Sequence, residues 1–205
     1  MNKWDYRFLK IAKEVATWSK DPSTQVGAIA VSDKRIIATG YNGFPKGVVD
    51  DDDLLIDRQA KLKLMVHAEM NMIYNATQHG VSLKGATVYV HGLPACEDCF
   101  KGLIQIGVAR VVMPDIEIHG KNWKSGCNFS KAQMKYVGIA VDEYNMFHDW
   151  QWNTNGQNKD TITEHLGEPQ TLHHHKELED ENPYMADDHY NLRDKNHGSE
   201  VDDIA

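Results

Sequence analysis

The sequence has no long hydrophobic run, few cysteines and no signal-like start. None of its 205 residues belongs to an apolar stretch of about 18 residues, the length that spans a bilayer, so a membrane-spanning helix is excluded. The first residues are charged and amphipathic, without the apolar segment of a secretory signal, and we expect a cytoplasmic location. Three cysteines, an odd number, do not form the disulfide framework of a small secreted domain. Metal binding or catalysis explains them better.

An excess of positive charge is also absent from the body of the chain. Residues 1–155 contain 18 Lys and Arg against 17 Asp and Glu, whereas residues 156–205 contain 4 against 13. A nearly neutral body lacks the basic surface that holds long nucleic acid by its phosphates. We therefore expect a small-molecule substrate, with neither a nucleic-acid polymer nor a membrane as partner. We divide the chain into one domain, 1–155, and an acidic, weakly ordered tail, 156–205.

The first part of the domain combines a helix with a hairpin. Helical periodicity predicts a helix over 4–18, whose apolar stripe consists of Trp4, Phe8, Ile11, Ala12, Val15 and Trp18. Two β-rich runs, 25–31 and 35–39, are separated by a polar turn and predict an antiparallel hairpin. The stretch from 41 to about 65 has no clear period and is predicted to be a long loop, of the kind that often carries function.

Helices and strands alternate in the rest of the domain. The predicted elements are a helix at 66–78, a strand at 86–91, a helix at 97–106, a strand at 110–113, a helix near 130–135 and a strand at 138–142. Alternation implies parallel strand pairs, and the hairpin makes the five-stranded sheet mixed. The predicted fold is an α/β protein built as a three-layer α/β/α sandwich.

Three metal-binding side chains occur where predicted helices begin. His67 lies at the start of one helix, and Cys96 and Cys99 lie at the start of the next. Zinc accepts nitrogen and sulfur ligands, and a catalytic site takes three from the protein and leaves one position for water. Helix N-termini also stabilise thiolates. The sequence therefore predicts one catalytic Zn²⁺; the alternative is a closed structural site with a fourth ligand, for which His119 and Cys127 are candidates.

Glu69 follows the predicted zinc histidine by two residues. It is too close along the backbone to be a comfortable fellow ligand, yet it can reach water at the metal. A carboxylate in this place can take a proton from that water and deliver it to a substrate nitrogen. We therefore predict that Glu69 is the catalytic acid and base.

Four motifs together resemble one family. They are HAEMN at 67–71, PACEDC at 94–99, SKDPSTQVGA at 19–28 and GYNGFPKG at 40–47. With these motifs in order, the sequence resembles deoxycytidylate deaminases, a branch of the cytidine-deaminase-like superfamily, over about residues 4–145. Zinc-dependent nucleobase deaminases carry H-x-E followed by P-C-x-x-C, and here Pro94 stands one position earlier than in that pattern.

The resemblance implies hydrolytic deamination of dCMP to dUMP and ammonia, which supplies the precursor of thymidylate. In that reaction water activated by zinc attacks C4 of the cytosine, and Glu69 protonates N3 and then the departing amino group. The backbone amide of Ala68 holds the pyrimidine carbonyl, and a backbone carbonyl near Leu93 or Pro94 accepts from the amino group.

The resemblance also assigns substrate contacts. Asn42 is expected to contact the nucleotide; the alternative is a turn residue with left-handed backbone angles. Ser23 and Gln25 are expected to bind the 5′-phosphate; the alternative is a capped turn after the first helix.

Members of the family are commonly homo-oligomers, activated by dCTP and inhibited by dTTP. The loop containing Gly43 and Lys46 matches the region that reads the effector, and we expect it to be allosteric. The neighbouring aspartates at 50–53 could hold Mg²⁺ with a triphosphate effector; a solvated loop is the alternative.

Two other functions compete with this one. A deaminase of the same superfamily could act on dCTP or another cytosine compound, and selectivity between phosphates cannot be derived from the sequence. A deaminase of adenosine in tRNA is disfavoured by the neutral body. A non-catalytic zinc-binding scaffold is the alternative from another class, and Glu69 argues against it because a structural site needs no proton carrier.

Overall fold

The computed structural model describes residues 1–115 and 120–145. The predicted acidic tail, the boundary between 155 and 156, and His119 lie outside the described residues. Within the described ranges, no helix is both long and apolar enough to cross a membrane.

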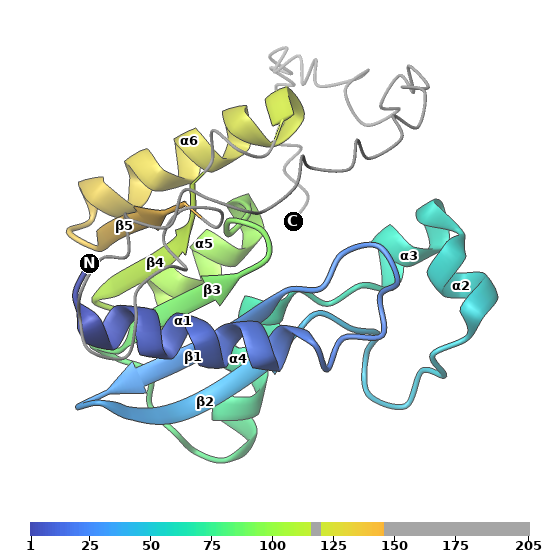
Figure 1. Cartoon of the computed structure of the whole chain (residues 1–205), viewed down its shortest axis with the longest axis horizontal. Coiled ribbons are helices and arrows are strands. Elements are labelled where there is room, and N and C mark those ends of the chain that lie inside the picture. The colour runs from blue at the N-terminus through green and yellow to red at the C-terminus, as the bar shows by residue number, and fades with distance from the viewer. Residues whose placement is uncertain (116–119, 146–205) are drawn as a thin grey trace, which may run out of the picture. The chain divides into compact units, whose positions relative to one another are not determined.

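Five strands form one mixed sheet in the order β2-β1-β3-β4-β5 (Figure 1). Strand β1 (Gly27–Ser32) pairs antiparallel with both β2 (Arg35–Tyr41) and β3 (Thr87–His91). Strands β4 (Arg110–Pro114) and β5 (Ala140–Tyr144) extend the sheet in parallel. The predicted mixed five-stranded sheet is confirmed.

Helices cover both faces of the sheet, as predicted for a three-layer sandwich (Figure 1). Helix α1 (Lys3–Ala16) packs on one face, whereas α4 (Ala68–Gln78), α5 (Glu97–Gln105) and α6 (Gly120–Tyr136) pack on the other. Alternate strand residues point to opposite faces, which gives two separate hydrophobic clusters. Those facing α1 include Ile29, Val31, Tyr89 and Val112. Those facing the other helices include Ala28, Ala30, Val88, Val90, Val111 and Met113.

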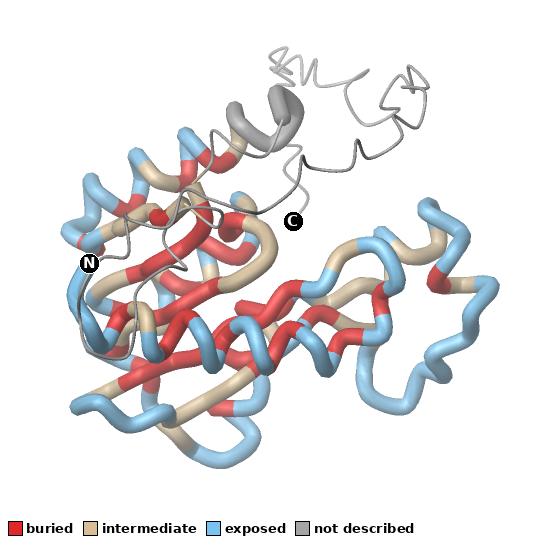
Figure 2. Tube along the Cα trace, viewed as in Figure 1, coloured by how far each residue is buried: buried red, intermediate tan, exposed pale blue. Residues whose placement is uncertain are grey.

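The central strands β1, β3 and β4 are the best buried part of the sheet (Figure 2). On α1, Phe8, Ala12 and Val15 are buried as predicted. Trp4 and Trp18, by contrast, are 38% and 52% exposed. The buried face of the helix also includes Asp5, Leu9 and Ala16, so it is rotated about the helix axis from the predicted stripe and is not narrower than it. The helix also ends at Ala16, before Trp18, and not at 18 as predicted.

The hairpin between β1 and β2 has a two-residue turn. Ser32 is paired with Arg35, and both turn residues have positive φ, 49° at Asp33 and 61° at Lys34. Such a turn follows the right-handed twist of the strands. The predicted hairpin is confirmed.

The predicted long loop at 41–65 contains two short helices, α2 (Asp52–Ile56) and α3 (Arg58–Leu64). Each begins at an aspartate whose carboxylate caps the helix. Asp51 accepts from the backbone N–H of Asp53, and Asp57 accepts from those of Gln59 and Ala60. The prediction of a loop was wrong here because capping stabilises helices too short to show an apolar period.

Two later predictions need correction. Helix α6 spans Gly120–Tyr136 and not only 130–135. Its Gly126 lies against the side chain of Glu97 on α5, and a glycine inside a helix weakens the helical pattern in the sequence. Strand β5 begins at 140 and not 138, because Gly138, with φ of +84°, ends α6.

Candidate active site

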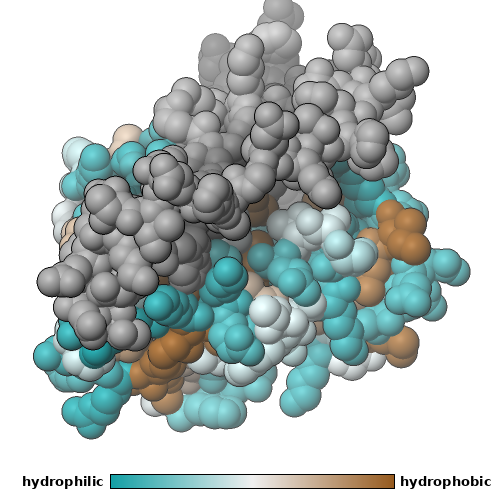
Figure 3. All heavy atoms as spheres, in the orientation of Figure 1, coloured by the Kyte–Doolittle hydropathy of each residue, from teal (hydrophilic) through white to brown (hydrophobic). Residues whose placement is uncertain are grey.

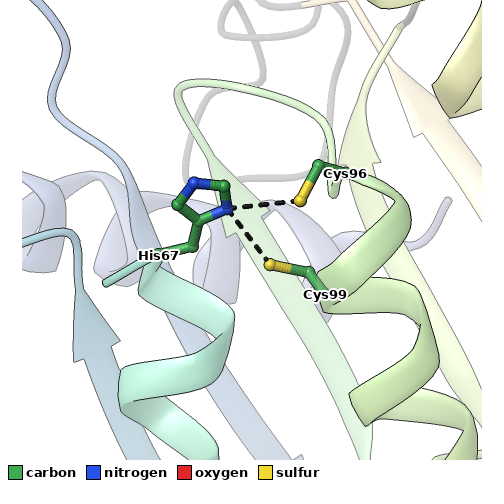
Figure 4. Close-up of side chains that lie close together, drawn as sticks. All are labelled: His67, Cys96 and Cys99. Carbon is green, nitrogen blue, oxygen red and sulfur yellow. Dashed lines mark hydrogen bonds between the residues drawn. The ribbon is translucent and has the colours of Figure 1, made fainter. Parts of the chain in front are cut away.

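Three metal-binding side chains converge where α4 and α5 begin (Figure 4). His67 immediately precedes α4, whereas Cys96 immediately precedes α5 and Cys99 lies in its first turn. Nδ1 of His67 lies 3.2 Å from Sγ of Cys96 and 3.4 Å from Sγ of Cys99. The structure thus brings together the three residues that the sequence predicted as zinc ligands.

Two glycines allow the close backbone contacts that position the N-termini of α4 and α5. A Cβ on Gly40 of β2 would lie 2.2 Å from the backbone nitrogen of Met72 and 2.4 Å from the carbonyl oxygen of Ala68, so only glycine permits the close approach of α4. Gly92, with φ of +107°, turns the chain out of β3 towards Cys96. There a Cβ would lie 2.4 Å from the carbonyl oxygen of Gln25.

His67 and Cys96 occupy the N-cap positions of α4 and α5, and neither side chain caps its helix by a hydrogen bond. These positions usually hold Ser, Thr, Asp or Asn, whose oxygens accept from the first backbone N–H groups. Here the side chains remain free for one another and for a metal. The free N–H groups and the positive helix ends favour negative sulfur.

The electrostatics of the three groups favour a cation. Hydrogen bonds with Cys99 and His67 lower the pKa of Cys96 to about 4, against the opposing effect of burial. The interaction with Cys96, together with burial, raises the pKa of Cys99. Interaction with the same sulfur raises the pKa of His67. The group therefore holds protons around a thiolate, and a metal ion can take their place.

The donor set fits zinc. Bonds of about 2.0 Å to nitrogen and 2.3 Å to sulfur at a tetrahedral angle place the two donor atoms about 3.5 Å apart. The observed separations of 3.2 and 3.4 Å are close to this value. The three donor atoms all lie within 4.8 Å of one another, so one ion between them reaches all three.

Glu69 lies in the first turn of α4 and is 3% exposed. Burial raises the pKa of its carboxyl group. Burial thus favours the protonated form of the carboxyl group, and a carboxyl group that can hold a proton suits a general acid and base.

A cavity of about 500 Å³ opens at these residues. His67, Glu69 and Cys96 line it together with Ala68 and the segment 93–94, so candidate metal ligands and the buried carboxyl group face one space. Asn42 and Ser23, predicted as substrate contacts, also line it.

Asn42 is buried, and its side chain is bonded to the chain at both ends. Its Oδ1 accepts from the backbone nitrogen of Val26 at 2.8 Å, and its Nδ2 donates to the carbonyl oxygen of Thr24 at 2.9 Å. Among the described non-glycine residues, only those of the β1–β2 turn have positive φ, so the alternative of a left-handed turn residue was wrong. Asn42 shapes the edge of the pocket, and a contact with the nucleotide stays a prediction.

Three other predicted residues lie outside the lining of this cavity. Gln25 is exposed and donates from Nε2 to the carbonyl oxygen of Ser19 at 2.7 Å. Lys46 is exposed in its loop. Gly43 forms a bridge with Val66, donating at 3.1 Å and accepting at 2.9 Å. The allosteric roles of Gly43 and Lys46 stay predictions, as does the phosphate role of Gln25.

Sequence reasoning missed the charged residues on another part of the pocket, Asp21, Arg58 and Lys61. Arg58 and Lys61 belong to the stretch predicted as a loop. A signal was available, because two basic residues three positions apart share one face of a helix. This spacing is informative only if the segment is helical, and the sequence pattern did not predict helix α3.

Cys127 stands apart from the metal ligands. It is 1% exposed, and its thiol donates to the carbonyl oxygen of Ala95 at 3.7 Å. Burial raises its pKa to about 11. It packs as a small hydrophobic residue, and the group formed by His67, Cys96 and Cys99 does not include it.

A three-layer sheet domain that presents one His and two Cys beside a buried carboxylate defines a zinc enzyme of the hydrolytic type. The family model of the cytidine and deoxycytidylate deaminase zinc-binding region matches residues 2–114. The chain belongs to this deaminase family.

Similar proteins agree with that assignment. The human deoxycytidylate deaminase is 38% identical over 68% of this chain and 85% of its own length. The deoxycytidylate deaminase of enterobacteria phage T4 is 31% identical over 78% of this chain and 97% of its own length. The crystal structure of the cyanophage S-TIM5 dCMP deaminase with dCMP and dUMP matches 67% of this chain and 94% of its own at 23% identity with a TM-score of 0.54, which supports the fold.

Proposed function

We propose that this protein deaminates dCMP hydrolytically to dUMP and ammonia. The observation that carries the proposal is the shared pocket, in which the buried carboxyl of Glu69 lies beside His67 and Cys96. Proteins named deoxycytidylate deaminase cover most of the described chain at 31–39% identity and support dCMP as the substrate.

Each group in the pocket has a part in this chemistry. His67, Cys96 and Cys99 would hold zinc, and the bound ion would supply the Lewis acidity that activates water. The reaction forms a C4–O bond and breaks the C4–N bond, so a proton must reach the amino group as it leaves. The attacking water supplies two protons, and Glu69 takes them in turn: it delivers the first to N3 of the ring and the second to the leaving amino group.

Backbone groups orient the base. The N–H of Ala68 belongs to the first turn of α4, where backbone donors have no partner within the helix, and it donates to the pyrimidine carbonyl. A carbonyl oxygen of Leu93 or Pro94, both in the pocket lining, accepts from the amino group.

Ammonia release tests the proposal. The zinc-loaded protein is assayed with dCMP, dCTP, deoxycytidine and cytosine, alongside E69Q. We expect dCMP to be the preferred substrate, and we expect E69Q to bind zinc and to lose activity by a factor of about 10² to 10⁴, the usual contribution of general acid–base catalysis. Turnover confined to dCTP or cytosine would reject dCMP as the substrate. A wild type as inactive as E69Q would instead favour the zinc-binding scaffold.

We further propose that dCTP activates and dTTP inhibits a homo-oligomeric enzyme through the loop containing Gly43 and Lys46. Gly43 bridges Val66, the residue before His67, so a ligand on this loop has a short path to the metal site. The Mg²⁺ predicted near 50–53 would accompany the triphosphate, although Asp50 pairs with Lys20 at 2.7 Å and Asp51 caps α2. Activity and light scattering with dCTP or dTTP, with and without Mg²⁺, test these points.

A further inference from the structure

Two cationic side chains on the pocket wall have no part in the deamination chemistry. Arg58 and Lys61 of α3 line the same cavity as Glu69. Because they are three positions apart on a helix, they lie on one face of it. Among the lining residues that the structure describes, Asp21 is the only other charged one apart from the metal-binding residues and Glu69.

Asp21 and Ser23 hold Lys61 in place. Oδ1 of Asp21 accepts from the backbone nitrogen and the hydroxyl of Ser23, at 2.9 and 2.8 Å, and from the backbone nitrogen of Thr24 at 3.2 Å. Nζ of Lys61 donates to the same Oδ1 at 3.1 Å and to Oγ of Ser23 at 2.6 Å. Asp21 is 5% exposed, so this small network is built into the body of the domain.

Counting donors shows which residues can bind an anion. The backbone N–H and the hydroxyl hydrogen of Ser23 are both used by Asp21, so Ser23 has no donor left for a ligand. An ammonium group has three N–H donors, and Lys61 uses two of them. Arg58 offers the five donors of its guanidinium group, and within the described ranges no hydrogen bond or ion pair of its side chain occurs.

The charge on this wall is positive. Asp21 offsets one of the two cations, so Arg58, Lys61 and Asp21 together retain one positive charge. Arg58 also presents a planar fork of donors, which matches the oxygens of a phosphate. Arg58 is exposed and α3 has no buried residue, whereas the side chain of Lys61 is 14% exposed and lines the cavity. Hydrophobic residues gather on the surface over α2 and α3 (Figure 3). A ligand can therefore reach the cations without opening the core.

We infer that Arg58 and Lys61 bind the 5′-phosphate of the substrate and so distinguish a nucleotide from a nucleoside. The inference rests on the proposed function, because it takes the ligand of the pocket to be a nucleotide. Asp21 and Ser23 are positioning residues that aim Lys61. The sequence predicted that Ser23 binds the phosphate directly. In this proposal the two cations on α3 bind it instead.

Equilibrium binding of the reaction product tests the inference without any chemical step. Isothermal titration calorimetry measures dUMP and deoxyuridine binding to the zinc-loaded wild type, R58Q, R58K, K61Q and K63Q. Lys63 lies on α3 and outside the pocket lining, so K63Q is the matched control. Each charged hydrogen bond to a phosphate is expected to contribute roughly tenfold in affinity.

We expect R58Q and K61Q to weaken dUMP binding tenfold or more and to change deoxyuridine binding less than twofold. R58K should recover part of the loss, and K63Q should match the wild type. Equal binding of dUMP and deoxyuridine by the wild type, or the same loss for both ligands in R58Q, would overturn the inference. If the wild type binds dUMP through Arg58 but deaminates no cytosine compound, the proposed function fails while the phosphate site stands.

Discussion

Cys96, Cys99 and Cys127 are the same side chain in three environments. Cys96 and Cys99 face His67 at the start of α5, and the contacts of Cys96 lower its thiol pKa to about 4. Cys127 contacts a backbone carbonyl in the core, and burial raises its pKa to about 11. Only a thiolate binds zinc well, so position decides the chemistry of each cysteine.

Alanine substitution of each cysteine tests this division. We expect C96A and C99A to lose bound zinc on dialysis, as measured by metal analysis, and to lose deaminase activity with it. C127A should keep one zinc per chain and its activity, while losing about 1 kcal/mol of stability through the small cavity that it leaves. Loss of zinc from C127A would instead identify a fourth ligand.

At the scale of elements, the contact between β2 and α4 places His67 and Glu69. Gly40 lets the strand and the first turns of the helix approach to a distance that leaves no room for a Cβ, which would lie 2.2 Å from the backbone nitrogen of Met72. The atom in the way is backbone and not a flexible side chain. Relief therefore requires that the strand and helix move apart.

G40A is accordingly expected to lower the free energy of unfolding by about 2 to 3 kcal/mol, the upper part of the usual range for single substitutions. It should also reduce deaminase activity, because α4 carries Glu69, the proposed acid and base. Urea denaturation measures the first effect. The control is G43A, whose Cβ would meet nothing closer than 3.7 Å, and its stability should stay within about 0.5 kcal/mol of the wild type. Similar effects of both variants would contradict the role given to Gly40.

At the scale of the whole domain, a buried ion pair joins α1 to the far strands. Asp5 is 1% exposed and accepts from the hydroxyl of Tyr89 on β3 at 2.8 Å and from Arg110 on β4 at 2.7 Å. Arg110 also donates to Asp142 on β5 at 2.6 Å. Burial alone would raise the pKa of Asp5, but hydrogen bonds from Arg110, Asn2 and Tyr89 outweigh it and lower the pKa.

This lowered pKa predicts an acid-sensitive contribution to stability. Asp5 contributes its stabilisation above its ordinary pKa of 3.8, and the contribution is lost as the pH falls through the lower pKa of the folded state. At pH 7, the free energy of unfolding of D5N should be about 3 kcal/mol lower than that of the wild type, because Arg110 loses its buried charged partner. Urea denaturation of both proteins from pH 7 downward should show the difference shrinking below about pH 4. A constant difference across this range would refute the assignment.

The predictable part of the fold is the part with regular periodicity. The hairpin, strand β3 and helices α4 and α5 follow from alternating or helical patterns and from their turn residues. Helices α2 and α3 were not predicted, because they are stabilised by capping and show no apolar stripe in the sequence. The length of helix α6 was underestimated because Gly120 and Gly126 interrupt the helical pattern in its first half.

The sequence by itself pointed to the candidate metal ligands and to the candidate acid. A residue's donor atoms are intrinsic to its side chain, and His67, Glu69, Cys96 and Cys99 stand at helix starts that local patterns predict. Tertiary structure alone decided which residues line the pocket: Gln25 does not, whereas Arg58 and Lys61 do. It also decided that both hydrogen-bond donors of Ser23 are used by Asp21. Which donors remain free depends on neighbours far apart in the chain, and folding is what brings those neighbours together.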